Sequence, residues 1–386
     1  MPCVEEFLCR FLRRESPSWP QAAGESFTIA DFLERARYHG VLPLVYDRLQ
    51  REPDSGQGWP QQVLQACHED ALGHAMWELR HRDLLMRVLA QLAKIGVRPV
   101  LFKGTALAYS LYPSRALRAR GDTDLIISPG ARRQASAALE ALGFTKQLDA
   151  GGELVFYQAS FIRHDERGGQ HTLDVHWRIN NSELLSRLFD YQELFRNARP
   201  VPRIGPDALA AGRVDALLLA CLHRATHHQA PYYVDAVAYY SGNRLIWLYD
   251  IHLLAGGFSH AEWDELIGLA REKGLLAVCL EGLERAQARF HTAIPEPVVA
   301  AMRLPGPPEA AARYLGGGVW RQQWMDFCAI AGTANKMRFL TETAFPPARY
   351  IRQKYPQGQS DWLPWLYLRR VSGGLLKRMH RQADTR

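Results

Sequence analysis

Two aspartates separated by a single threonine have the spacing that metal chemistry needs. In the segment GDTDLIIS, Asp122 and Asp124 open a run of apolar, β-branched residues that predicts a strand. Because side chains alternate along a strand, both carboxylates project from the same face. Two acids at the end of a strand buried by helices are costly unless a cation compensates their charge. The pair therefore predicts a metal site.

A third acid follows in a later predicted strand. In LDVHW, Asp174 stands between two apolar residues, and adjacent antiparallel strands would bring its carboxylate beside the first two. Three carboxylates, with water and phosphate oxygens, supply the hard oxygen ligands that Mg²⁺ or Mn²⁺ prefers. Two such ions can activate an attacking hydroxyl and neutralise a leaving pyrophosphate. We therefore expect Asp122, Asp124 and Asp174 to hold two metal ions.

Basic residues near the acids are candidates for phosphate binding. In FKGTAL, Gly104 and Thr105 lie at a predicted strand-to-helix turn, where free backbone N–H groups and the helix dipole favour a phosphate. Lys103 adds a positive charge at the same turn, and Arg118 and Arg120 lie just before the acids. For Arg120 the alternative is an ion pair with one of the two aspartates that holds the metal-free site together.

Three further residues are hypothesised to act on the acceptor side. His176 either orients an acid or contacts substrate, although a histidine beside a tryptophan is more often structural. Asp250, in WLYDIHLL, faces either the cleft or a neighbouring helix, and it or His223 is a candidate to bind or deprotonate the acceptor. The motif HRATHH (His223, His227 and His228) lacks the glutamate of a zinc protease helix, so zinc is not expected there.

The predicted elements place the acids in an α+β unit. VRPVLF (97–102) predicts the first strand, followed by a helix from Thr105 to Leu111, the strand DLIIS and the helix PGARRQASAALEALGF. LVFYQ, SFIRHD and HTLDVHWRI predict three further strands, the last two joined by a hairpin turn at ERGGQ.

The sequence on both sides of this unit has helical periodicity. Helices are predicted before it at Glu5–Arg14, Ile29–His39, Leu42–Arg51 and Gln61–Ile95, and the helical pattern resumes after Asn181. A chain of 386 residues is also long enough for more than one packed unit. We therefore expect an N-terminal helical region (1–95), a core of mixed sheet and flanking helices (96–205) and a C-terminal helical region (206–386).

Composition excludes several classes of protein. With 47% apolar and 23% charged residues, the chain resembles neither disordered nor fibrous proteins. Acids interrupt the apolar residues of the N-terminal segment, and no apolar stretch is long enough for a membrane span, so a cytoplasmic location is expected. The six cysteines form no CxxC pair, which argues against a zinc ribbon or a disulfide framework.

The formal charge of +7 is compatible with phosphate ligands. Because no basic stripe stands out, a large nucleic acid is a less expected acceptor than a small molecule, peptide or glycan. The basic tail from Arg369 to Arg386 is expected to be solvated surface. Trp362, Trp365 and Tyr367 just before it suit either a partner surface or, more commonly, a core.

Taken together, FKGTALAYSLYPSRALRARGDTDLIIS and LDVHW resemble the bacterial uncharacterised nucleotidyltransferase family of the DNA polymerase β superfamily. The match is specific over residues 97 to 180 and looser through LIWLYDIHLL. The resemblance implies a polymerase β-type core in which Asp122, Asp124 and Asp174 are the metal ligands, while Gly104 and Thr105 correspond to a Gly-Ser turn that contacts phosphates. The gap from this turn to the acids is longer than is usual in the superfamily.

The resemblance implies transfer of a nucleoside monophosphate from an NTP donor to an unidentified acceptor, with release of pyrophosphate. Two other functions stay open from the residues alone. A nucleotide-sugar-dependent glycosyltransferase would use Asp122 and Asp124 without needing Asp174. A non-catalytic nucleotide-binding module would keep the fold without turnover, although three mutually repelling carboxylates argue against an unused site.

Overall fold

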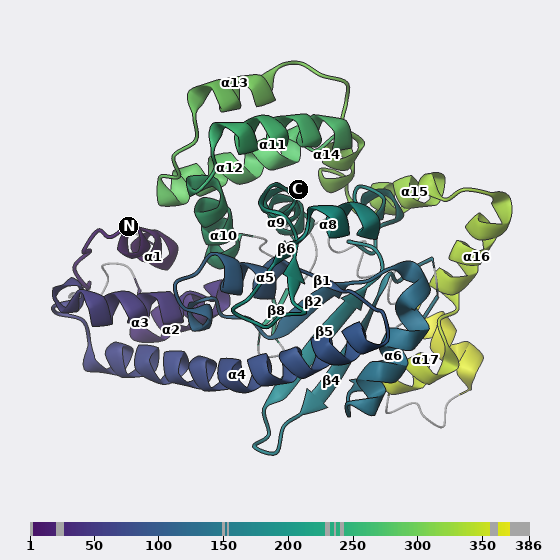
Figure 1. Cartoon of the computed structure of the whole chain (residues 1–386), viewed down its shortest axis with the longest axis horizontal. Coiled ribbons are helices and arrows are strands. Elements are labelled where there is room, and N and C mark those ends of the chain that lie inside the picture. Colours follow the sequence, from purple (N-terminus) through teal and green to yellow (C-terminus); the bar gives the residue numbers. More distant parts are fainter. Residues whose placement is uncertain are drawn as a thin grey trace.

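A mixed sheet of seven strands lies at the centre of the chain, with helices before and after it (Figure 1). The computed structural model describes residues 3–20, 27–148, 151–152, 154–227, 232–234, 237–239, 243–355 and 362–370. The strands are β1 (Val100–Phe102), β2 (Asp122–Ile126), β3 (Thr145–Lys146), β4 (Gln158–His164), β5 (Gln170–His176), β6 (Arg199–Pro200) and β7 (Leu209–Ala210). Their order is β3-β4-β5-β2-β1-β7-β6, and β8 (Tyr232–Val234) and β9 (Val237–Tyr239) form a separate hairpin.

Two strand pairs of the sheet are parallel, β2 with β5 and β1 with β7, and the other four are antiparallel. This mixture, together with the many helices, makes the chain an α+β protein, as predicted. The strand that carries the third acid was expected to run antiparallel to its neighbour β2, and this prediction is wrong. Asp174 does reach the strand that carries the other acids, but through a parallel pair.

The N-terminal helices are α1 (Val4–Leu12), α2 (Ile29–His39), α3 (Leu42–Arg51), the 3₁₀ turn η1 (Pro53–Gly56) and α4 (Gln61–Lys94). A capping box between Thr28 and Asp31 begins α2, and Gly40, with a φ of +70°, ends it. In Figure 1, α4 runs from the N-terminal helices across the strands of the sheet toward α6. Its C-terminal half buries Leu85, Val88 and other residues against the sheet.

The two faces of the sheet pack against different helices. Leu125, Leu173 and Val175 pack in one apolar cluster with α4 and α6 (Arg132–Ala141). Phe102 and Ile126 lie in a second cluster with the helices that follow the sheet. Asp122, Asp124 and Ile126 are alternate residues of β2, so their side chains point to the same face of the sheet. The two acids therefore face those later helices.

The helices after β5 are α7 (Glu183–Ser186), α8 (Tyr191–Asn197), α9 (Arg213–His227), α10 (Leu245–Gly256), α11 (His260–Lys273), α12 (Leu276–Phe290), α13 (Glu296–Arg303), α14 (Ala310–Leu315), α15 (Val319–Ala329), α16 (Thr333–Ala344) and α17 (Ala348–Lys354). Residues 363–370 are also helical. Within the described residues, no helix combines the length and apolarity that crossing a bilayer requires.

Most predicted elements are confirmed, including the first and second strands, the helices around them and the hairpin between β4 and β5. The separate strand predicted at LVFYQ is wrong, because Leu154 and Val155 lie in a turn and β4 begins only at Gln158. Side chains satisfy the backbone donors there: Leu154 N–H donates to Glu342, and Tyr157 N–H donates to Asn181.

The wholly helical pattern predicted after Asn181 is also wrong, because β6 and β7 extend the sheet and β8 and β9 form a hairpin within that region. The helix α5 (Lys103–Ser110) begins two residues earlier than predicted, directly after β1. Two short 3₁₀ turns, η2 (Arg115–Leu117) and η3 (Pro129–Ala131), flank β2. Residues 371–386 of the predicted solvated tail, and His228, lie outside the described residues.

Candidate active site

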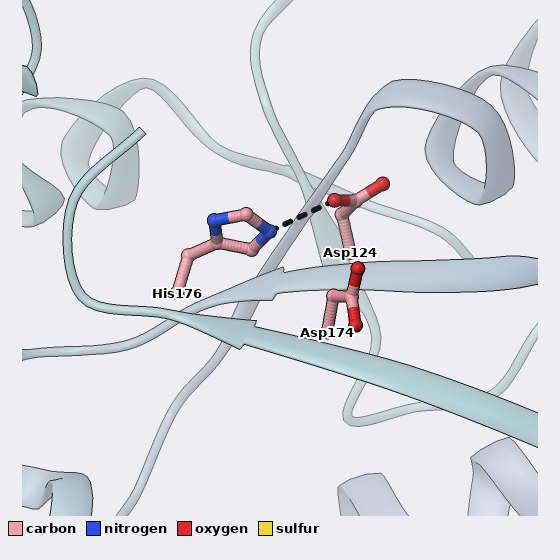
Figure 2. A group of neighbouring side chains, drawn as sticks. All are labelled: Asp124, Asp174 and His176. Atoms are coloured by element: carbon pink, nitrogen blue, oxygen red, sulfur yellow. Dashed lines mark hydrogen bonds and ion pairs between the residues drawn. The ribbon is translucent and has the colours of Figure 1, made fainter. Parts of the chain in front are cut away.

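Four side chains lie in one row across the centre of the sheet. The register pairs Phe102 of β1 with Asp124 of β2, Asp124 with Asp174 of β5, and Asp174 with Ser160 of β4. Residues in register on neighbouring strands point to the same face, so the row brings two of the predicted metal ligands side by side. Figure 2 shows the Asp124 and Asp174 carboxylates projecting toward the same space.

Asp124 is held by two nitrogen atoms. The Lys103 Nζ lies 2.6 Å from Asp124 Oδ1, and the His176 Nε2 lies 2.9 Å from the same oxygen (Figure 2). Although burial opposes ionisation, Lys103 and His176 hold the pKa of Asp124 well below its usual value. Asp124 is therefore a stable carboxylate in the protein without metal.

Asp174 and Asp122 are in the opposite electrostatic situation. Burial, and then the charges of Asp124 and Asp122, raise the pKa of Asp174 to about 7. The Ser160 hydroxyl donates a 2.6 Å hydrogen bond to Asp174 Oδ1. Desolvation in the cavity, and then the charge of Asp124, likewise raise the pKa of Asp122, even though part of this residue's surface stays exposed. Lys103 opposes the rise at both acids without cancelling it, and Arg118 and Arg120 do so at Asp122.

Lys103 stands at a sharp strand-to-helix junction. β1 ends at Phe102 and α5 begins at Lys103, whose φ of +58° is unusual for a residue other than glycine. This backbone reversal directs the lysine side chain back toward Asp124. The neighbouring Gly104 lies against the two arginines: a Cβ at this position would be 3.4 Å from Arg118 Nη1 and 3.5 Å from Arg120 Cδ.

Arg118 is fixed by an acid from the C-terminal helices. Its Nη2 donates to Asp250 Oδ2 at 2.7 Å and its Nε lies 3.1 Å from both carboxylate oxygens. The Tyr112 hydroxyl also donates to Asp250, at 2.7 Å. All three side chains are buried. Asp250, predicted to face either the cleft or a helix neighbour, thus lies behind Arg118.

Arg120 is fixed from the opposite side by the N-terminal helix α4. Its Nη2 lies 2.6 Å from Glu78 Oε2, its Nε donates to the Thr105 hydroxyl at 2.8 Å, and its guanidinium lies over the rings of Trp77 and Tyr109. The alternative that Arg120 pairs with Asp122 or Asp124 is therefore wrong, because Glu78 is its anionic partner.

Thr105 belongs to a buried hydrogen-bond network behind the acids. Its hydroxyl lies 2.8 Å from that of Thr123, which in turn lies 2.7 Å from His81 Nε2. Thr105, Thr123 and His81 are fully buried. The Thr105 side chain therefore contacts β2 and Arg120, and of Gly104 and Thr105 only Gly104 lines the cavity.

A cavity of about 330 Å³ opens above the acids. Residues from the sheet and its loops form one wall, including Lys103, Gly104, Arg118, Arg120, Asp122, Asp124, Asp174 and His176. Residues of α9 and the start of α10 form the other wall: Leu219, Leu222, His223, Thr226, His227, Arg244 and Trp247. This volume lies within the range of small-molecule sites in proteins.

The second wall carries an aromatic group. The His223 ring lies 4.5 Å from that of His227 and 5.0 Å from that of Trp247. Burial lowers the pKa of His223 well below its usual value and that of His227 to about 4, so both rings are neutral at neutral pH. The wall therefore offers flat, uncharged surfaces opposite the carboxylates, which suits a planar group such as a nucleobase.

The acids suit a divalent cation. Ligand atoms of Asp124, Asp174 and His176 lie within 4.8 Å of one another, and Asp122 stands two residues before Asp124 on the same face. The carboxylates supply the oxygen donors that Mg²⁺ and Mn²⁺ prefer, and a cation would relieve the repulsion that raises the pKa of Asp174. Burial and Lys103 lower the pKa of His176, so its neutral ring orients Asp124 through Nε2–H.

Of the predicted site residues, only Thr105 and Asp250 do not line the cavity. Sequence reasoning missed Ser160, Glu78, Arg244 and Trp247. Ser160 has a detectable signal, because antiparallel pairing through the ERGGQ turn sets it opposite Asp174. The ion pair of Glu78 with Arg120 has no such signal in the sequence, because Glu78 lies in α4, far from Arg120 along the chain.

A protein-family model matches the part of the chain that forms the cavity. A model of the family described as "Uncharacterised nucleotidyltransferase" matches residues 25–291, which include the acids, both arginines and both walls of the cavity. A search of curated proteins found no match. The matched region covers more than half of the chain, and the chain therefore belongs to the uncharacterised nucleotidyltransferase family.

Proposed function

We propose that this protein is a metal-dependent nucleotidyltransferase with a polymerase β-type core. In this proposal it moves a nucleoside monophosphate from an NTP to an acceptor hydroxyl or phosphate and releases pyrophosphate. The observation that carries the proposal is the in-register pair of Asp124 and Asp174 at the floor of a cavity lined by Lys103, Arg118 and Arg120. Family membership supports nucleotidyl transfer in general.

In the proposed reaction, the carboxylates hold the cations. Asp122, Asp124 and Asp174 would hold the ions, and Asp174 would act on the side of the acceptor hydroxyl. When bound, the ions neutralise the triphosphate and favour deprotonation of the acceptor hydroxyl. His176 donates to Asp124 and keeps that carboxylate oriented. Ser160 does the same for Asp174.

The basic side chains bind the phosphates. Lys103, which contacts Asp124 in the protein without metal, provides the positive charge closest to the acids. Arg118 and Arg120 present guanidinium groups that buried acids have already oriented, which reduces the entropy lost when a phosphate binds. We further propose that the aromatic wall holds the nucleobase or acceptor, and that the acceptor is a small molecule, peptide or glycan.

Isothermal titration of each NTP with Mg²⁺ tests the donor assignment. Wild type is compared with Asp122→Asn/Asp124→Asn, and Asp264→Asn on the exposed face of α11 serves as the control. We expect Mg²⁺-dependent NTP binding that the double variant loses and the control keeps. If folded wild type binds no NTP, the donor assignment fails.

The Asp174→Asn variant separates this function from the glycosyltransferase alternative. A nucleotidyltransferase needs the third carboxylate for its ions, so we expect the variant to lose pyrophosphate release once an acceptor is found. An enzyme that uses a nucleotide sugar through Asp122 and Asp124 would keep turnover without Asp174 and would release no pyrophosphate. NTP binding without turnover on any acceptor would favour the non-catalytic module.

A further inference from the structure

The C-terminal arm, defined here as residues 319–355 and 362–370, runs along one edge of the molecule (Figure 1). It is fixed to the rest of the protein at specific points. Asp326 accepts hydrogen bonds from the Ser182 hydroxyl at 2.7 Å and from Leu184 N–H at 3.1 Å, and Glu342 accepts one from Leu154 N–H at 3.0 Å. These hydrogen bonds fix the position of the arm, so the side chains on its outer side have a defined arrangement.

The outside of the arm is unusually apolar. Fourteen large apolar side chains are exposed among the described residues, and eight of them lie in the arm. These eight are Trp320, Trp324, Met337, Leu340, Phe345, Trp362, Trp365 and Leu368. They include every exposed tryptophan and phenylalanine of the described residues. The helices α15 and α16 bury no residue fully.

The helical stretch 363–370 also has exposed apolar side chains on its outer side. One side packs inward, because Leu366 is fully buried and the Tyr367 hydroxyl donates to the Pro346 carbonyl at 2.7 Å. On the other side Trp365 is 56% exposed and Leu368 is also exposed, and Trp362, directly before the helix, is 76% exposed. Of the two alternatives left open for these aromatic residues, burial in a core does not hold for the two tryptophans.

The positive charge of the chain is concentrated in the same part of the sequence. Residues 319–386 carry 12 lysines and arginines against 4 aspartates and glutamates, a net charge of +8. The whole chain carries +7, from 47 basic and 40 acidic residues, so residues 1–318 together carry −1. Arg349, Arg352 and Lys354 of α17 are among the exposed basic residues of the arm.

We propose that the arm binds the surface of an anionic phospholipid membrane without spanning it. Tryptophan and phenylalanine favour the boundary between lipid headgroups and acyl chains, and lysine and arginine are attracted to anionic headgroups. A second copy of this chain fits less well, because two arms repel each other and the rest of the chain carries a net charge of only −1. This inference does not depend on the proposed nucleotidyl transfer.

Sedimentation of the full chain with vesicles tests the proposal. Vesicles of phosphatidylcholine alone are compared with vesicles in which phosphatidylglycerol is about a third of the lipid. We expect binding to the anionic vesicles only, decreasing as salt is added. The charge variant Arg349→Gln/Arg352→Gln/Lys354→Gln should lower the partition coefficient on the order of a hundredfold, since each basic residue contributes about fivefold.

Matched variants elsewhere on the protein serve as controls. Arg87→Gln/Lys94→Gln/Arg98→Gln removes the same charge from exposed positions outside the arm and should leave binding within about twofold of wild type.

The apolar contribution is tested with Trp324→Ser/Trp362→Ser/Trp365→Ser, which should abolish binding. Leu72→Ser/Met76→Ser/Leu79→Ser, at exposed positions of α4, is its control. Circular dichroism checks that each variant is folded.

Three results would overturn the proposal. The first is no sedimentation with either vesicle, and the second is equal binding to neutral and anionic vesicles. The third is self-association in analytical ultracentrifugation that the tryptophan variant loses while vesicles bind nothing, which would assign the arm to a second copy of the chain.

Discussion

Arg118, just before β2, forms a buried ion pair with Asp250 of α10, 132 positions later in the chain. Two guanidinium nitrogens contact the carboxylate, and the Tyr112 hydroxyl donates to it as well. Arg120 has an equivalent partner in Glu78 of α4. Helical regions on both sides of the sheet therefore each supply one acid that fixes one arginine of the cavity.

The first prediction concerns this ion pair. Asp250→Asn should lower the free energy of unfolding by about 3 kcal/mol, because it leaves the buried charge of Arg118 without its anion. The double variant Arg118→Gln/Asp250→Asn removes both charges and should recover part of that loss. Chemical denaturation measures both effects.

The same variants separate two roles of Asp250 in ligand binding. Arg118→Gln should weaken NTP binding about tenfold, and Asp250→Asn should add nothing in that background if the acid acts only through the arginine. Additive losses in titration calorimetry would instead mean that Asp250 contacts a ligand by itself, as the sequence hypothesis allowed.

The second prediction concerns Glu78 and Arg120, whose side chains are 2% and 1% exposed. Glu78→Gln should lower the free energy of unfolding by about 3 kcal/mol, since the guanidinium stays buried without its carboxylate. Glu69→Gln changes an exposed residue of the same helix and should change stability by less than about 0.5 kcal/mol. Equal urea midpoints for the two variants would contradict a structural role for the Glu78 ion pair.

Local patterns explain which parts of the site were predictable. Alternation around Thr123 is sufficient to set Asp122 and Asp124 on one face of β2, and the ERGGQ turn is sufficient to predict the β4–β5 hairpin. The direction of β5 relative to β2 was not predictable in this way. A parallel pair depends on connections through other elements, which no short segment encodes.

Packing between segments far apart in the sequence explains which features could not be predicted. Thr105 looked like a phosphate contact because it follows Gly104, but its hydroxyl points into the network with Thr123 and Arg120. The aromatic spacing around Trp362 and Trp365 was compatible with a core helix or with a partner surface. Periodicity reports that a helix has an apolar face, and it does not report whether any element covers that face.

The third prediction follows from the raised pKa of Asp174, which is about 7 because of burial and the neighbouring acids. A metal ligand must be deprotonated, so protons and the cation compete for this carboxylate. Mn²⁺ binding should tighten by up to about tenfold per pH unit as pH rises toward 7 and level off above it. Calorimetry in buffers of different ionisation enthalpy should detect proton release on binding.

Asp174→Asn serves as the comparison, because its affinity for Mn²⁺ should be weaker and should vary less with pH. Asp122, whose pKa is also raised, can add to the slope in both proteins. If wild type binds Mn²⁺ equally well on both sides of neutral pH, Asp174 is not a ligand of the ion.

The fourth prediction concerns stability and pH at Asp215, in the first turn of α9. Burial raises the pKa of Asp215 to about 6, and its Oδ1 has no hydrogen-bond partner among the described residues, while Oδ2 accepts from Asn197 at 3.0 Å. The folded protein therefore keeps a proton that the unfolded chain releases near its ordinary pKa of 3.8. Stability from this group is complete at low pH and is lost as pH rises to about 6.

Asp215→Asn isolates this effect from the other titrating groups. The variant keeps the size of the side chain and an oxygen for Asn197, so it should gain stability relative to wild type as pH rises from about 4 to about 6, by at most about 3 kcal/mol. Above that range the difference should be constant. A difference in thermal midpoint that stays flat across the whole range would mean that Asp215 is ionised in the folded protein at all these pH values, and that Asn197 and the helix dipole are sufficient to stabilise its charge.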